Sequence, residues 1–257
     1  MVRDLAAEVV DDARDRRRDA GRHGRDPRPR PREELTGVHE KRRAVADHQG
    51  EHLLERARRL DQEARAMCER LGLWRRLESL GAPVVVGAAG LGVIDRRDID
   101  ITTSCVALNE ETIGRITSLG AELASHEDVR QVVLRDDTGR WNTDPRYPDG
   151  YYLGLEIMSP REKLWTADLW FVGEPERQPD LEHLRRFAPL VTDESRGAIL
   201  ALKRSVRTRG TGDDPVPGYL VYEAVIQDAV RSETEFQEWL NHRRTESATH
   251  DEGPHAS

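Results

Sequence analysis

The chain has 257 residues, of which 34% are charged, and its formal net charge at pH 7 is -8. This length allows one large domain or two small ones, and the negative charge argues against a protein that binds nucleic acid through bulk electrostatics. No apolar run approaches the ~20 residues that a membrane span needs, and the N-terminus lacks the apolar core of a secretion signal. The two cysteines, Cys68 and Cys105, show neither disulfide nor zinc spacing. We therefore expect a soluble cytoplasmic protein with no membrane partner.

Both ends of the chain are poor in apolar residues. Residues 1–32 combine arginine, aspartate and proline, and residues 244–257 are short and polar. Such segments cannot bury enough apolar surface to fold, so we expect two disordered tails. Residues 33–80 instead repeat apolar side chains at helical spacing, which predicts an N-terminal region of one or two amphipathic helices.

The central segment, residues 81–175, mixes strand and helix patterns. A helix is expected after Asn109, whose side chain is a suitable N-cap, and residues 176–243 return to helical spacing. These patterns predict an α+β fold in which a mixed sheet of four or five strands is flanked by helical N- and C-terminal regions. The strands are expected at 83–86, 98–102, 129–134, 151–158 and 164–172.

Two aspartates, Asp98 and Asp100, interrupt an otherwise apolar strand. Residues two apart in a strand face the same side, so both carboxylates share one face while Ile99 and Ile101 face the core. Adjacent carboxylates raise each other's pKa unless a cation lies between them, and hard oxygen ligands on a rigid support favour Mg²⁺ with phosphate oxygens completing its shell. Asp-x-Asp also occurs by chance on exposed edge strands, so its context decides between the two interpretations.

The context of these aspartates consists of a small-residue turn before them and a third aspartate after them. The preceding strand ends in Gly87 and Ala88, where backbone N–H groups can approach phosphate oxygens. The Asp-x-Asp strand follows some ten residues later, and a later strand carries Asp168. Together these features resemble the nucleotidyltransferase fold of the DNA polymerase β superfamily. The resemblance implies that Asp98 and Asp100 bind metal ions, and that Asp168 completes the metal site and accepts the proton of the attacking hydroxyl.

The resemblance covers roughly residues 71–172 and implies that nucleotide phosphates lie against the turn of Gly87 and Ala88. Active members usually carry serine where this chain has Ala88. The alanine removes one hydrogen bond of ~1 kcal/mol or more to a charged group. This departure leaves open a specialised enzyme or an inactive member of the family.

Three cations are candidates for neutralising the nucleotide phosphates, namely Arg96, Arg97 and Lys203. Solvated side chains on a loop and a helix are an equally good interpretation of each. Aromatic residues near the strands have the same two interpretations, because Trp141, Tyr151 and Tyr152 can stack on a substrate or pack the hairpin. Glu156 is expected to be an exposed strand residue. Tyr222 is expected to pack within a helical region.

The resemblance implies a Mg²⁺-dependent enzyme that moves a nucleoside monophosphate from a nucleoside triphosphate such as ATP to a hydroxyl. The negative charge and modest size favour a small hydroxylated acceptor, such as an aminoglycoside-like antibiotic or a metabolite, over a template duplex. A toxin-like enzyme that modifies RNA or protein is the first alternative, and a catalytically inactive binding or regulatory module is the second. A basic surface would support the RNA alternative, and its candidate residues are Arg185, Arg186, Lys203, Arg204, Arg207 and Arg209.

Overall fold

The computed structural model describes residues 32–144, 146–209 and 216–251. The chain divides into two compact units, residues 1–42 and 43–257. In the first unit only the start of helix α1 (Arg32–Arg70) is described, and the features below belong to the second. The tail predicted at residues 1–32 therefore lies outside the described residues, apart from Arg32 itself.

The predicted C-terminal tail differs from the structure. Helix α8 (Glu233–Asp251) continues past residue 243, so the prediction of disorder is wrong for residues 244–251, and the remainder lies outside the described residues. Neither glycine nor proline occurs in α8, and the first of them after it are Gly253 and Pro254. Polarity alone therefore did not mark the end of this helix, because no strong helix breaker interrupts it before residue 251.

The helical pattern predicted for residues 33–80 is confirmed as two helices, α1 and α2 (Leu73–Glu78). Gly72, between them, has a φ of +60°, a left-handed conformation that favours glycine. Buried side chains of α1 at helical spacing, including Leu60, Ala64 and Met67, belong to the main hydrophobic core. No described helix is both long enough and apolar enough to cross a membrane.

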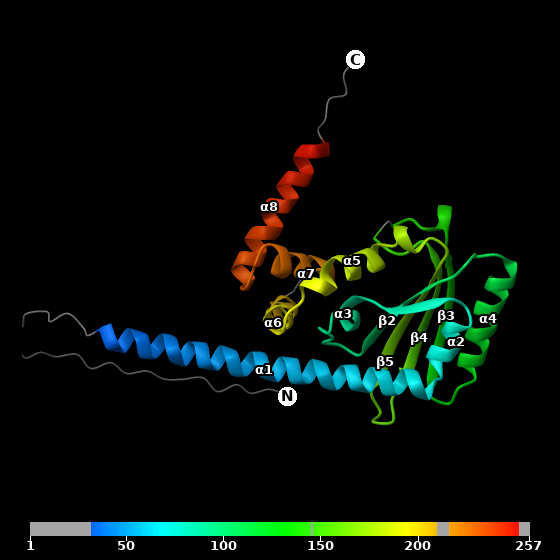
Figure 1. The fold of residues 1–257 in the computed structure, drawn as a ribbon, viewed down its shortest axis with the longest axis horizontal. Coiled ribbons are helices and arrows are strands. Elements are labelled where there is room, and N and C mark those ends of the chain that lie inside the picture. The colour runs from blue at the N-terminus through cyan, green and yellow to red at the C-terminus, as the bar shows by residue number, and fades with distance from the viewer. Residues whose placement is uncertain (1–31, 145, 210–215, 252–257) are drawn as a thin grey trace, which may run out of the picture. The chain divides into compact units, whose positions relative to one another are not determined.

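The sheet has five strands in the order β1-β2-β5-β4-β3 (Figure 1). Strands β2 and β5 are parallel, and the other neighbouring pairs are antiparallel. This mixed sheet confirms the predicted α+β class. The strands are β1 (Ala82–Val85), β2 (Asp98–Ser104), β3 (Val129–Asp137), β4 (Gly150–Met158) and β5 (Leu164–Val172).

The remaining helices connect the strands or follow the sheet. Asn109 caps α4 as predicted, its side chain accepting a hydrogen bond from the backbone N–H of Thr112 at 3.0 Å. The turn predicted around residue 88 contains the single-turn helix α3, which the small residues of that segment permit. The helices are α3 (Gly87–Gly90), α4 (Glu110–Ala124), α5 (Pro179–Phe187), α6 (Asp193–Arg209) and α7 (Gly218–Gln227), with 3₁₀ turns at Gly139–Trp141, Pro175–Arg177 and Ala188–Leu190.

The two faces of the sheet differ in chemistry. One face is apolar and buried, and helix α4 packs beside it against β3. The other face carries carboxylates and hydroxyls, and a hydroxyl of this face, on Thr102, donates a hydrogen bond to Asp180 of α5. The alternation follows directly from the two-residue period of a strand. The buried face of β2, β4 and β5 consists of Ile99, Ile101, Leu153, Leu155, Ile157, Ala167, Leu169 and Phe171.

Candidate active site

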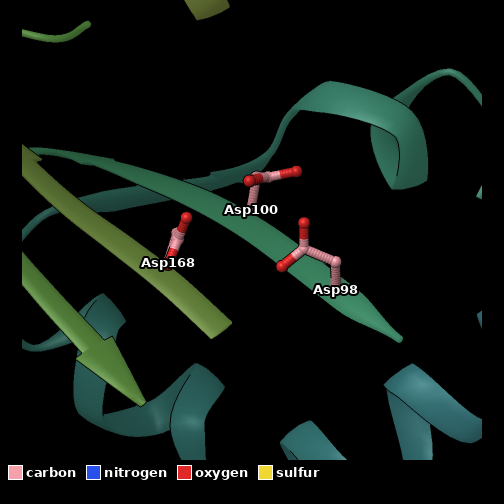
Figure 2. A group of neighbouring side chains, drawn as sticks. All are labelled: Asp98, Asp100 and Asp168. Atoms are coloured by element: carbon pink, nitrogen blue, oxygen red, sulfur yellow. The ribbon is translucent and has the colours of Figure 1, made fainter. Parts of the chain in front are cut away.

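Three aspartates meet on the polar face of the sheet, and we call Asp98, Asp100 and Asp168 the aspartate triad. Asp100 of β2 lies directly opposite Asp168 of β5 in the parallel register, and Asp98 lies opposite Thr166. Each aspartate offers one carboxylate oxygen, and these three oxygens lie within 4.8 Å of one another. Figure 2 shows the side chains turned toward a common space beside the short helix that precedes β2. The structure thus brings together the carboxylates that the sequence singled out.

The triad is held by neutral hydroxyl donors. The Tyr152 hydroxyl donates a hydrogen bond to Oδ1 of Asp168 at 2.7 Å, and the Thr166 hydroxyl donates one to Asp98. Burial, together with the nearby Asp98 and Asp168 carboxylates, raises the pKa of Asp100 to about 8. Burial also raises the pKa of Asp168, although the hydrogen bond from Tyr152 opposes this effect. The triad therefore keeps a proton near neutral pH unless a cation compensates its charge.

The turn that precedes the triad approaches it closely. Gly87 has a φ of +59°, and a Cβ at this position would lie 2.4 Å from Oδ2 of Asp100. Glycine is therefore required here both for the backbone conformation and for the close approach. Ala88 follows within α3 and, like Gly87, lines the cavity above the triad.

The triad opens into a cavity of about 890 Å³, a size typical of ligand pockets. On the sheet side, the Arg135 guanidinium lies 4.5 Å from the centre of the Tyr152 ring, whose centre is 5.0 Å from that of Trp170. On the helix side, the His183 and Tyr219 rings stack with their centres 5.2 Å apart. The cavity thus has two aromatic walls, one from the sheet and one from α5 and α7.

A second group of charges lines the same cavity, and we call Asp95, Arg96, Lys203 and Arg207 the Asp95 cluster. The Nζ atom of Lys203 lies 2.8 Å from Oδ1 of Asp95, and Arg207 forms an ion pair with the other carboxylate oxygen. Burial lowers the pKa of Lys203, and Asp95 opposes that shift. Lys203, which the sequence offered as a candidate phosphate ligand, lines the cavity.

The other predicted residues take different places. Arg97 does not line the cavity, because its side chain lies beside α1, with Nε 3.9 Å from Oε2 of Glu63. Trp141 is 57% exposed and is also absent from the lining. Glu156 shares the polar face with Thr166 but pairs with Arg130 at 3.3 Å.

The adjacent residues Tyr151 and Tyr152 of β4 also contact different aspartates. The Tyr151 hydroxyl donates to Asp136 at 3.3 Å, whereas Tyr152 reaches Asp168. Tyr222 lines the cavity in addition to packing in α7. The sequence analysis did not place Tyr222, Asp95 or Asp180 at the cavity. Residues far apart in the chain meet at the cavity, and no local pattern in the sequence indicates such a meeting.

Neither family models nor curated protein sequences match the chain. Solved structures that resemble it include a cytoplasmic RNA terminal U-transferase, with 12% identity and a TM-score of 0.45 over 69% of this chain and 50% of that chain. Cid1 in complex with the UTP analogue UMPNPP shows 13% identity and a TM-score of 0.47 over 71% and 53%. The GLD-2/RNP-8 complex shows 14% identity and a TM-score of 0.42 over 70% and 54%. The chain spans about half the length of these structures.

The likeness to these structures is partial, so the functional assignment rests on the geometry of the cavity. The five-stranded mixed sheet, with its aspartate triad beside a glycine turn, agrees with the nucleotidyltransferase-like fold that the sequence indicated.

Proposed function

We propose that the chain is a divalent-metal-dependent nucleotidyltransferase that moves a nucleoside monophosphate from a nucleoside triphosphate to an acceptor hydroxyl. The observation that carries this proposal is the aspartate triad in the 890 Å³ cavity, whose carboxylate oxygens lie within 4.8 Å of one another. The Asp95 cluster supplies cations at the same cavity. A cavity with both features suits a ligand that combines phosphates with a divalent cation.

The triad fits a hard divalent cation such as Mg²⁺. Its ligand atoms are carboxylate oxygens, which such ions prefer. Burial raises the pKa values of Asp100 and Asp168, so a bound cation would offset the cost of their negative charge. We propose Asp98, Asp100 and Asp168 as the ligands. When bound, the cation would supply Lewis-acid stabilisation of the charge on the transferred phosphoryl group.

The side chains of the cavity divide the remaining tasks. Asp168, oriented by the Tyr152 hydroxyl, is proposed to accept the proton of the acceptor hydroxyl. Lys203 is proposed to bind phosphate oxygens, because its ammonium group lines the cavity and remains largely buried. Gly87 and Ala88 are proposed to let the nucleotide approach the backbone, while Arg97 has no part in this assignment.

A small hydroxylated molecule is proposed as the acceptor. The sheet wall of the cavity offers the rings of Tyr152 and Trp170, which suit an acceptor with a planar group, whereas the charge of Arg135 is paired with Asp137 at 2.6 Å.

An RNA acceptor is the second candidate, and it depends on the basic residues of α5 and α6. Arg185 donates hydrogen bonds to the carbonyl oxygens of Leu181 and Pro175, and Arg186 donates one to Gln227. These engaged side chains, with Lys203 and Arg207 held by Asp95, form a poorer track for a phosphate backbone than free cations would.

The test is a transfer assay with nucleoside triphosphates labelled at the α-phosphate. The protein is incubated with Mg²⁺ and, separately, with a small-molecule fraction and an RNA fraction, and labelled products are identified by mass spectrometry. We expect label in small molecules with the wild type and none with Asp168→Asn. Label in RNA alone would reassign the acceptor, and triphosphate binding without any transfer would establish the inactive module.

A further inference from the structure

The two edge strands of the sheet differ in how open they are to a further strand. β1 has four residues and contains Pro83, whereas β3 has nine residues and no proline. Short strands and prolines protect an edge, because an open edge presents unpaired backbone N–H and C=O groups to other chains. β3 pairs with β4 on one side, and no backbone hydrogen bond joins residues 131–137 to any other described segment. The outer edge of β3 is therefore open within the described part of the chain.

Apolar side chains are exposed along this open edge. Val133 and Leu134 are 38% and 41% exposed. Val133 lies opposite Gly154 of β4 and so belongs to the polar face of the sheet, while Leu134 belongs to the opposite face. Neither residue lines the cavity, so the proposed transfer reaction does not account for their exposure. A strand paired with β3 would cover both.

Helix α4, which packs against β3, leaves room at this edge. Arg115 and Glu122 of α4 contact α2 and its C-cap, and α2 in turn packs against β1 at the far edge of the sheet. Because a helix turns by about 100° per residue, Thr117 and Ala124 project from the other side of α4, toward the open edge. Both are exposed, and both are small. The flank of α4 therefore does not obstruct a second chain that approaches β3.

The sequence of β3 is complementary to itself in one antiparallel register. Alternate residues direct both backbone groups outward, so a two-fold axis between two copies has to pass beside a residue rather than between two residues. With the axis at Val133, Val132 of each copy lies opposite Leu134 of the other, so apolar side chains meet. Gln131 lies opposite Arg135 in the same register, and this pair brings an amide to a guanidinium without like charges.

The charges at the ends of β3 fit the same register. Asp136 and Asp137 of each copy lie beside the end of the other copy that carries Arg130, whose side chain is 66% exposed. The neighbouring registers fit less well. An axis at Leu134 sets Val132 opposite Asp136, and an axis one residue further sets two copies of the same guanidinium against each other. Charge and apolar pattern thus select the axis at Val133.

We propose that the chain forms a homodimer in which the β3 strands of two copies pair antiparallel about a two-fold axis at Val133. The two five-stranded sheets then form one continuous sheet, and the interface is the same patch on both copies, as two-fold symmetry requires. Residues opposite each other in an antiparallel ladder lie on the same face of a sheet. The polar faces of both copies are therefore continuous, and both cavities open on that face. This interface does not depend on the proposed transfer reaction.

An extended segment of a different protein is the competing occupant, because strand addition to an open edge also recruits peptides. Such a segment has no need of a self-complementary β3 and would leave the purified chain monomeric. The position of Val133 separates the two occupants, since only the homodimer sets this residue against its own copy.

The experiment is sedimentation equilibrium of the full chain over a range of micromolar concentrations. We expect the wild type to approach the mass of two chains. Val133→Lys and Val133→Glu, each measured alone, should raise the dissociation constant of the dimer about tenfold or more, because like charges then meet at the axis. An equimolar mixture of the two variants should restore the dimer, because lysine then lies opposite glutamate. This recovery would also show that both variants fold.

Val84→Lys is the matched control. Val84 is 36% exposed and lies on the polar face of the other edge strand, opposite Thr102, and its substitution should leave the dimer intact. Hydrogen exchange of the wild type is the second measurement, and amides of residues 131–137 should exchange more slowly at concentrations where the dimer forms. A monomeric wild type, a dimer that survives Val133→Lys, or two monomeric variants whose mixture fails to dimerise would each overturn the inference.

Discussion

The aspartate triad and the Asp95 cluster solve the problem of a buried carboxylate in opposite ways. Asp95 has a cation of the chain on each of its oxygens. Among the described residues, the hydrogen bonds to the carboxylates of the triad come from neutral hydroxyls, those of Tyr152 and Thr166, and burial with mutual repulsion raises the pKa of Asp100 to about 8. A buried carboxylate with its own counter-ions organises the protein, whereas an uncompensated group of carboxylates calls for a cation from outside the chain.

This contrast predicts that replacing aspartate by asparagine lowers the stability of the free protein at Asp95 and raises it in the triad. Removing the charge of Asp95 leaves the buried Lys203 without its ion-pair partner, while removing a charge from the triad relieves repulsion in the free protein. Transfer activity should nevertheless fall when a charge is removed from the triad, because the triad is proposed to carry the chemistry. The experiments below test the contrast, beginning with the largest expected effect.

Replacing Asp168 with Asn should lower kcat by roughly 10²–10⁴-fold, since the amide cannot accept the proton of the acceptor hydroxyl. The measurement is the rate of transfer at saturating nucleoside triphosphate and Mg²⁺. Glu156→Gln is the control, because Glu156 lies on the same face of the sheet but pairs with Arg130 and does not line the cavity. Equal losses in both variants would mean that the triad has no special role.

Replacing Asp95 with Asn should destabilise the free protein by about 3 kcal/mol, because Lys203 is left buried with an unpaired charge. Urea unfolding with the variant and the wild type measures the difference. Adding Lys203→Met in the same chain should restore part of the lost stability by removing that charge. A stability unchanged from the wild type would show that Asp95 does not compensate the buried charge of Lys203.

Asp100→Asn should stabilise the free protein relative to the wild type, and this difference should grow as the pH rises. The folded-state pKa of Asp100, about 8, lies above its ordinary value of 3.8, so its contribution to stability is complete below pH 4 and is lost as the pH rises through 8. The variant avoids that loss, so its Tm in EDTA should exceed that of the wild type by a few degrees at pH 9 and by less at pH 5. Mg²⁺ should raise the Tm of the wild type but not that of the variant. A lower Tm for the variant at pH 9 would mark Asp100 as structural.

The triad was predictable from the sequence because its signal is local. The two-residue period of a strand places Asp98 and Asp100 on one face, and Asp168 stands out as an acid among strand apolars. The parallel register that sets Asp168 opposite Asp100 is not a local property, although the resemblance implied that Asp168 completes the same metal site. The role of Asp95 was missed because its partners lie in α6, a pairing that only the tertiary fold creates.

The cations were only partly predictable. Lys203 lines the cavity, whereas Arg97 pairs with Glu63 beside α1. Residue type indicates that a side chain is able to bind phosphate, but the direction in which it leaves the backbone decides whether it does. Arg96, one position earlier, lines the cavity instead. Adjacent residues of similar chemistry can therefore differ in place, and the sequence alone offered no basis for choosing between them.

The smallest effect is expected for Tyr152→Phe, which sharpens the contrast between neutral and charged partners. The Tyr152 hydroxyl donates to Asp168 at 2.7 Å, and the ring lies over Gly154, where a Cβ would be 2.4 Å from the hydroxyl oxygen. Phenylalanine keeps the ring and its contacts with Arg135 and Trp170 but loses one neutral hydrogen bond of about 1 kcal/mol. We therefore expect kcat to fall about fivefold with KM for the triphosphate unchanged, because Asp168 loses orientation while phosphate binding is untouched. Steady-state kinetics measure both constants. A large rise in KM with an unchanged kcat would show that Tyr152 serves nucleotide binding and that Asp168 is oriented without it.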